Sequence, residues 1–133
     1  MAPSSNRDII ETAFEDWAAG RRSFYDLCAA DASITIMGQS RFSGTFSKDA
    51  FLRERARPFM ARFSTRIVPA NWKIWVDEDD VIARWDSHAI ASDGKPYNNS
   101  YAFFITMKDG TATSLTMFLD MSAFEDVWNR CQP

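Results

Sequence analysis

The sequence predicts an α+β fold in which helices near the amino terminus precede an antiparallel sheet. Three patterns indicate this fold. Apolar residues recur at helical spacing near the amino terminus, and four later segments alternate apolar and polar residues. Turns containing Asp-Gly, at 92–96 and 108–110, join two pairs of those segments and are typical of β-hairpins. The 133-residue length is that of one domain, which we expect to span 1–133.

Capping residues mark where the helices are expected to begin. Ser5 is the predicted N-cap of the first helix, and Gly20 is a natural stop for it. A shorter helix is expected from Ser23, and Ser47 precedes a third helical pattern. Pro58 lies inside this third pattern, so we expect it to kink or divide the helix.

Five segments have the alternation of β-strands. Gly38 and Gly44 bracket a predicted loop, and Ser122 is the predicted N-cap of a short terminal helix. The last four strands are expected to form an antiparallel meander. The predicted strands are 31–39, 65–76, 81–91, 97–107 and 111–120.

Composition and charge exclude several classes of protein. The net charge of −3 argues against nucleic-acid binding, and no apolar run approaches the roughly 18 residues of a membrane span. The amino terminus lacks the apolar core of a signal peptide, so we expect a cytoplasmic location. Cys28 and Cys131 fit no metal-ligand spacing and are expected to be free thiols, and we expect neither a metal nor a cofactor.

Aromatic residues are unusually frequent, with 11 Phe, 5 Trp and 3 Tyr. A domain of this size cannot easily hide so many rings in one compact core, so some should line a cavity or a subunit interface. One group of rings lies at helical spacing on the apolar faces of the predicted helices. Tyr101 and Phe103 form a second group on the proposed pocket face. The third group, Trp75, Trp85, Phe104 and Phe118, is assigned to the sheet face away from the cavity, where two sheets of a homodimer would pack.

A row of polar residues on one strand is the main candidate for chemistry. Arg84, Asp86 and His88 share one face of the strand 81–91. One interpretation is a solvated sheet face. The other is a polar row at the bottom of an apolar cavity, with Asp86 as a general base, Arg84 orienting it and His88 as an acid or second base.

If one face of the predicted sheet is taken as the face of the pocket, it brings further candidate residues together with this row. Together they describe a mostly apolar small-molecule site with a few convergent polar groups. Taken singly they are weak evidence, since a Trp on a helix stripe or a Met is usually part of the core. The predicted substrate-binding residues are Trp17, Met37, Gln39, Asn99, Tyr101 and Met117.

Several segments resemble the SnoaL-like, ketosteroid isomerase-related branch of the nuclear transport factor 2-like superfamily. The resemblance implies a cone-shaped, curved antiparallel sheet around a pocket, closed by the amino-terminal helices, usually in a homodimer. The matching segments are ITIMG at 34–38, SGTF at 43–46, KDAF at 48–51, DGKPYNNSY at 93–101, DG at 109–110 and FLD at 118–120.

The known activities of these relatives imply different sites. Ketosteroid isomerases have carboxyl groups where this chain has Thr35 and Ala102. Limonene epoxide hydrolases have an Arg-x-Asp pair that matches Arg84 and Asp86, but their second Asp falls at Met117. Their water-binding Tyr and Asn fall near Met37 and Gln39. For the polyketide cyclases, Asp120 is the nearest candidate acid or base.

Three functions therefore stay open. The first is an isomerase, cyclase or dehydratase that transfers protons on a hydrophobic cyclic substrate through Asp86. The second is a non-catalytic binding or accessory dimer of the same fold, which the missing carboxylates favour. The third is an epoxide hydrolase-like lyase or hydrolase with an incomplete site.

Overall fold

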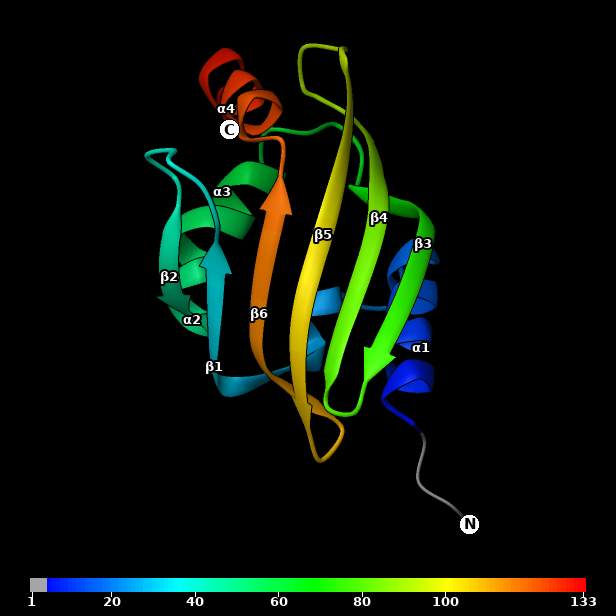
Figure 1. The fold of residues 1–133 in the computed structure, drawn as a ribbon. Coiled ribbons are helices and arrows are strands. Elements are labelled where there is room, and N and C mark those ends of the chain that lie inside the picture. The colour runs from blue at the N-terminus through cyan, green and yellow to red at the C-terminus, as the bar shows by residue number, and fades with distance from the viewer. Residues whose placement is uncertain (1–4) are drawn as a thin grey trace.

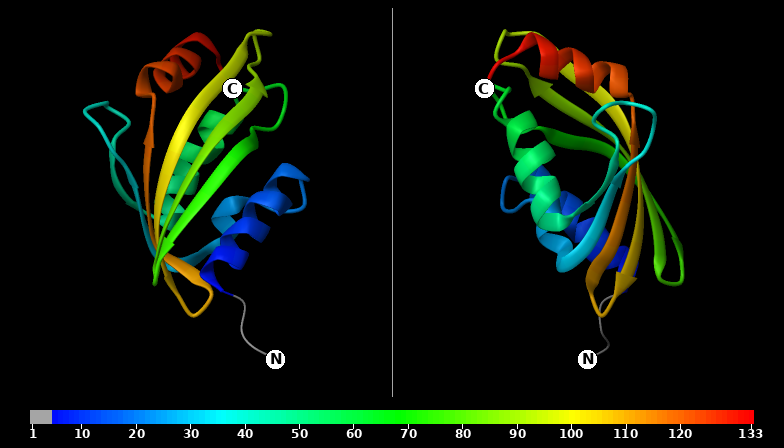
Figure 2. Two further views of the ribbon diagram at one scale, coloured as in Figure 1. Left: turned by 45° about the vertical axis from the view of Figure 1, so that its right-hand side comes forward. Right: turned by 90° about the vertical axis from the view of Figure 1, so that its left-hand side faces the viewer.

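A six-stranded sheet curves around the helices that cover one of its faces (Figures 1 and 2). The computed structural model describes residues 5–133. Residues 1–4, on which the predicted cytoplasmic location partly rests, lie outside the described residues. The elements are α1 (Asn6–Ala18), η1 (Phe24–Leu27), β1 (Cys28–Ile36), β2 (Gly44–Ser47), α2 (Lys48–Phe51), η2 (Leu52–Ala56), α3 (Arg57–Met60), β3 (Val68–Asp77), β4 (Asp80–Ile90), β5 (Pro96–Lys108), β6 (Thr111–Leu119) and α4 (Met121–Arg130).

The α+β prediction is confirmed, with one change in topology. The strand order is β2-β1-β6-β5-β4-β3, and β3 to β6 form the expected antiparallel meander. However, β1 pairs with β6 in parallel, so the sheet is not antiparallel throughout. The chain also forms a strand, β2, between the predicted loop and the predicted third helix, where no strand was expected, and β2 completes a hairpin with β1.

The predicted caps of the first two helices are confirmed. The Ser5 hydroxyl accepts a hydrogen bond from the backbone N–H of Asp8, and the helix gives way to Gly20 at a φ of 76°, a left-handed conformation that glycine adopts without strain. Ser23 and Asp26 form a reciprocal capping box at η1, which is a 3₁₀-helix. These local signals determine where α1 and η1 begin.

Pro58 changes the third helix without breaking it. The helical segment widens to a π-turn at Leu52–Ala56, where the Arg57 N–H bonds to the Leu52 carbonyl. Proline also frees the carbonyl four residues earlier, that of Glu54. The Arg55 guanidinium donates to this carbonyl at 3.0 Å. The proline therefore helps to place Arg55.

The last helix begins at a different cap from the one predicted. The Asp120 carboxylate accepts from the backbone N–H groups of Ser122 and Ala123, so Asp120 is the N-cap and Ser122 lies within α4. This helix covers one end of the curved sheet (Figure 2). Within residues 5–133, no helix is long and apolar enough to cross a membrane.

Register assigns the two faces of the sheet. In the β4–β5 hairpin, Trp85 lies opposite Tyr101 and Asp86 lies opposite Ser100. Directly opposed residues of an antiparallel pair point to the same face. The face of Trp85 and Tyr101 is buried under the helices, and the face of Asp86 and Ser100 lies outside. We call these the inner face and the outer face.

Candidate functional site

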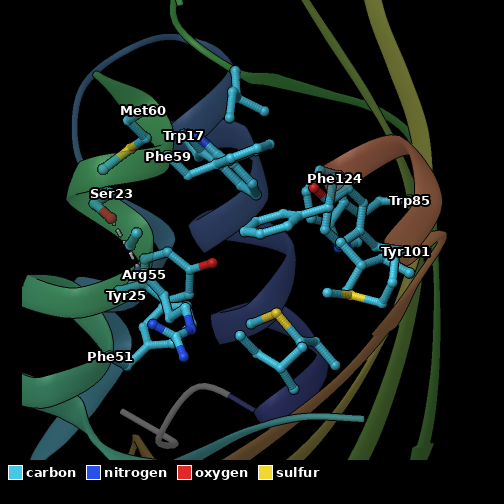
Figure 3. Close-up of a pocket in the computed structure, with 16 residues that line it drawn as sticks. Trp17, Ser23, Tyr25, Phe51, Arg55, Phe59, Met60, Trp85, Tyr101 and Phe124 are labelled. Carbon is cyan, nitrogen blue, oxygen red and sulfur yellow. Dashed lines mark hydrogen bonds between the residues drawn. The ribbon is translucent and has the colours of Figure 1, made fainter. Parts of the chain in front are cut away.

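The inner face and the helices enclose an aromatic pocket with a cavity volume of about 80 Å³ (Figure 3). Its wall combines side chains from α1, η1, the α2–α3 segment, four strands and α4. The lining residues are Trp17, Ser23, Tyr25, Ile36, Phe51, Arg55, Ala56, Phe59, Met60, Ile67, Trp85, Tyr101, Met117, Leu119, Met121 and Phe124.

Two stacked pairs of rings give the pocket flat walls. Trp85 and Tyr101 stack with their centroids 4.1 Å apart and their planes 8° apart, and Trp17 meets Trp85 edge-on at 4.7 Å. At the other end, Phe59 of α3 stacks on Phe124 of α4 at 4.1 Å. Rings held by these contacts keep their orientation, so the pocket is suited to a flat, apolar molecule.

Two phenol groups enter the pocket from opposite sides. Figure 3 shows Tyr25 on the helical side and Tyr101 on the sheet side. Burial raises the pKa of Tyr25 and that of Tyr101 above the usual value for a phenol. Both hydroxyl groups therefore remain neutral at pH 7 and act as hydrogen-bonding groups rather than as bases.

Arg55 supplies the pocket's positive charge. Its Nε donates to the Phe42 carbonyl at 3.1 Å and its Nη1 to the Glu54 carbonyl at 3.0 Å, while the guanidinium lies 4.9 Å from the centre of the Phe46 ring. These contacts leave further N–H groups of the half-buried guanidinium free. Among residues 5–133, no other charged side chain lines the pocket.

One buried donor beside the pocket lacks a partner. Within the described part of the chain, Trp85 Nε1 is the one buried side-chain polar atom without a hydrogen bond. A buried, unpaired N–H group costs about 1–3 kcal/mol. The free energy lost here is offset by the packing of the Trp85 ring, which is 1% exposed.

The prediction that Arg84, Asp86 and His88 lie in the pocket is wrong. All three lie on the outer face, because the β4–β5 register puts even-numbered residues of both strands there. The expected face combined even-numbered residues of β4 with odd-numbered residues of β5, and those point in opposite directions. Asp86 accepts from Ser100 Oγ at 2.8 Å and from Asn71 Nδ2 at 3.2 Å.

The outer polar row is satisfied by neighbours on its own face. The hydrogen bonds from Ser100 and Asn71 lower the pKa of Asp86, to which Arg84 adds a weaker contribution from Nη2 at 3.8 Å. His88 Nδ1 hydrogen-bonds to Asn98 Oδ1 at 2.9 Å. The arrangement is that of the solvated face, the first of the two interpretations of this row. In residues 5–133, no group of three or more His, Cys, Asp or Glu side chains is arranged to hold a metal ion.

The predicted substrate-binding residues divide into three groups. Trp17, Tyr101 and Met117 line the pocket, and their binding role stays a prediction. Met37 and Gln39 do not line it, because β1 ends at Ile36 and both are exposed in the loop that follows.

Asn99 and Asp120 have structural contacts at the end of the sheet. Asn99 faces inward but lies behind Tyr101, where it is 6% exposed and fully hydrogen-bonded. Asp120 is exposed and caps α4, outside the pocket.

The main residues that the prediction missed are Tyr25, Arg55 and Trp85. Trp85 was assigned to the opposite face, and pairing it with Tyr101 across the hairpin would have placed it correctly. No pattern in the sequence marks Tyr25 or Arg55 as pocket residues, because both reach it through the way the helices pack on the sheet.

No family model matches this sequence, and no curated protein matches it either. Solved structures do match. An NTF2-like protein from Burkholderia thailandensis has a TM-score of 0.74 at 16% identity, covering 98% of this chain and 100% of that one. The chain has the NTF2-like fold. This fold explains the arrangement of a curved sheet, a covering set of helices and an enclosed pocket.

Two other proteins with the NTF2-like fold carry descriptions of activity. A candidate isomerase from Bacillus subtilis has a TM-score of 0.75 at 13% identity, covering 95% of this chain and 96% of that one. IdmH from Streptomyces antibioticus, a candidate polyketide cyclase, has a TM-score of 0.71 at 16% identity, covering 95% of this chain and 99% of that one. At these identities, the comparison shows a shared fold rather than a shared reaction.

Proposed function

We propose that the protein binds a small, flat, largely apolar molecule in the aromatic pocket. The observation that carries this proposal is that two stacked pairs of rings, Trp85 with Tyr101 and Phe59 with Phe124, line one cavity. A flat ligand gains apolar contact with both walls, and the Tyr25, Tyr101 and Arg55 polar groups contact its polar edge.

The chemistry of the lining favours binding without reaction. In the part of the chain that the structure describes, no Asp, Glu or His lines the pocket. The two phenols stay neutral at pH 7 because burial raises their pKa values. General acid–base catalysis works best with a group that titrates near the working pH. The second of the three functions, a non-catalytic binding protein, is therefore the better supported.

The small cavity limits the ligand to one ring, or to two fused rings when flexible side chains of the lining move aside. Its volume of about 80 Å³ is well below the roughly 300–1,000 Å³ of sites for drug-sized ligands. Met60 and Met121 lie at its edge, and methionine side chains adapt readily to an occupant. A bicyclic ketone such as 1-indanone is a suitable probe.

Tryptophan fluorescence provides the test, because Trp17 and Trp85 line the pocket. Saturable quenching by 1-indanone is expected in the wild type. It should be lost in Ala56→Phe, which fills the cavity, and kept in Asp86→Asn on the outer face. Absence of saturable binding in the wild type, or equal binding by Ala56→Phe folded to the same melting temperature, would contradict the proposal.

A second candidate function is isomerisation or cyclisation through an enolate. It is favoured by the two neutral phenols, which are the kind of donors that stabilise a developing oxyanion. Because no carboxylate or imidazole among the described residues lines the pocket, the proton on carbon would pass to a base from the solvent, such as hydroxide. Deuterium exchange at the carbon next to the 1-indanone carbonyl, followed by NMR in D₂O, separates the two functions. Binding alone predicts the exchange rate of buffer, whereas catalysis predicts an acceleration that Tyr101→Phe reduces.

We also propose that two copies associate through the outer face. Trp75, Ile82 and Phe104 lie side by side on β3, β4 and β5, and each is at least 36% exposed. Phe118 on β6 extends the patch and contacts Phe104 with the ring centroids 5.4 Å apart. Exposed apolar patches of this kind are typical of protein interfaces. Sedimentation of the wild type at micromolar concentration should show a dimer, and a monomer would contradict this proposal.

A further inference from the structure

A chain of hydrogen bonds leads from the start of α4 to the pocket. Asn99 Nδ2 donates to the Tyr97 hydroxyl at 2.8 Å, and the Tyr97 and Tyr101 hydroxyl groups lie 2.8 Å apart. All three residues are on the inner face of β5, and all three are buried. Tyr101 alone of the three lines the pocket.

The orientation of the Asn99 amide is determined by the backbone. Its Oδ1 accepts from the N–H groups of Ser100 at 2.8 Å and Asp120 at 3.3 Å. Its Nδ2 therefore faces the Asp120 carbonyl, at 3.1 Å, and the Tyr97 hydroxyl. All donors and acceptors of this amide are used. The reversed orientation would place like groups together at the three backbone contacts, and only the Tyr97 hydroxyl could pair with either end of the amide.

The Asn99 amide in turn determines the direction of the two phenol protons. Because Nδ2 is only a donor, the Tyr97 oxygen accepts from it. Within residues 5–133, Tyr101 Oη is the one remaining partner for the Tyr97 proton, and Tyr97 is 2% exposed. If Tyr101 donated to Tyr97 instead, the Tyr97 proton would be buried without a partner, which is unfavourable. Tyr97 is therefore the donor, which leaves the Tyr101 proton for an acceptor in the pocket, in competition with the buried Ser87 hydroxyl nearby.

We infer that Asn99 and Tyr97 are positioning residues that hold the Tyr101 hydroxyl as a hydrogen-bond donor into the pocket. The pocket consequently selects molecules that present an acceptor oxygen, such as a ketone or an enolate, over molecules of equal size that present an N–H or O–H donor. This inference rests on the proposed binding function and specifies the class of ligand. Arg55, a donor without any acceptor atom in its side chain, gives the pocket the same preference.

Three bicyclic probes of similar size test the inference by their affinities. They are 1-indanone, an acceptor; indole, an N–H donor; and indene, which has neither group. The wild type should bind 1-indanone about threefold to tenfold more tightly than indene, the range expected for one net hydrogen bond, and indole no more tightly than indene. Equal affinities for 1-indanone and indole in the wild type would overturn the inference.

Two variants test the chain itself. In Asn99→Asp, the carboxylate accepts from Tyr97, so Tyr97 accepts from Tyr101 and the Tyr101 proton turns away from the pocket. The preference should then move from 1-indanone to indole. Tyr97→Phe removes one oxygen and frees the Tyr101 hydroxyl to rotate, so the ratio of the two affinities should fall about threefold or more. Asn98→Asp makes the same chemical change on the exposed outer side of β5 and should leave the ratio unchanged.

The outcomes separate this inference from the proposed function. If the wild type binds none of the three probes, the proposed function fails and the inference fails with it. If the wild type prefers 1-indanone but Tyr97→Phe keeps the wild-type ratio, the pocket binds ligands and the positioning role is wrong. The Tyr97→Phe variant tests the positioning role even if Asn99→Asp does not fold, because Tyr97→Phe keeps the aromatic ring and its packing.

Discussion

The two faces of the same four strands, β3 to β6, have opposite characters. On the inner face, Trp85 is 1% exposed and packs among rings from α1 and β5. On the outer face, Trp75 is 44% exposed. Both faces carry aromatic and polar residues, so composition does not distinguish them. The difference shows that coverage by the helices, rather than the kind of residue, makes one face a pocket.

The polar residues differ between the faces in the same way. Inner polar groups are few and are joined in a chain that ends at the pocket, through Asn99, Tyr97 and Tyr101. Outer polar groups pair with neighbours on their own surface, as Asp86 does with Ser100. A triad of Arg, Asp and His is therefore insufficient evidence of a catalytic site when it lies in the open.

The largest expected effect is on the stability of the inner face. Trp85→Ala removes a fully buried ring and should lower the free energy of unfolding by about 3–5 kcal/mol. Trp75→Ala is the matched change on the outer face and should cost under about 1 kcal/mol in the monomer. Urea denaturation at low protein concentration measures both, and equal losses would show that the comparison between the faces is wrong.

The next effect concerns association through the outer face. Phe104→Glu places a charge at the centre of the exposed apolar patch and should weaken dimerisation by about 2 kcal/mol or more, roughly thirtyfold in the dissociation constant. Lys108→Glu, further along the same face of β5 and outside the aromatic patch, is the control. Analytical ultracentrifugation gives both constants, and a dimer unaffected by Phe104→Glu would assign the interface to another surface.

A smaller effect is expected on ligand affinity, and it distinguishes two neighbouring residues of β5. Tyr101→Phe should weaken the binding of 1-indanone about threefold to tenfold through loss of one hydrogen bond. Ser100→Ala, which points to the outer face, should leave that affinity unchanged. Calorimetric titration of both variants makes the comparison. A matching loss in Ser100→Ala would mean that the outer face takes part in binding.

The smallest expected effect is a pH dependence of stability on the outer face. The hydrogen bonds from Ser100 and Asn71 lower the pKa of Asp86 in the folded state. A lowered folded-state pKa gives stability that is present above the ordinary carboxyl pKa and is lost as the pH falls through the lowered value. Asp86→Asn should therefore destabilise the protein slightly at pH 7 and by less at pH 2–3. Unfolding curves at both pH values test this, and a loss that grows toward low pH would contradict it.

Most elements of the fold could be predicted from local signals. Ser5, Ser23 and Ser47 cap the helices at which they were expected, and the alternating segments are strands. The errors arose where contacts between residues far apart in the sequence determine the secondary structure. β2 was missed because the four residues Gly44–Ser47 become a strand only by pairing with β1, and this pairing extends only to Ile36, the last residue of β1.

The candidate site could be predicted only in part. Trp17, Tyr101 and Met117 line the pocket. The proposed chemistry of Asp86 failed because it depended on the register between β4 and β5, and a shift of one residue exchanges the two faces. No pattern in the sequence marked Tyr25 or Arg55 as pocket residues, since each reaches the pocket from a helix whose position depends on packing.

The sequence by itself determined that neighbouring residues of each strand lie on opposite faces, because that alternation is a property of the extended backbone. It also determined where helices begin, since a cap is a contact between residues two or three positions apart. Only the tertiary structure decided which face is covered. That choice depends on strand register and on where α1, η1 and α2–α3 pack, and both are set by contacts between residues far apart in the chain.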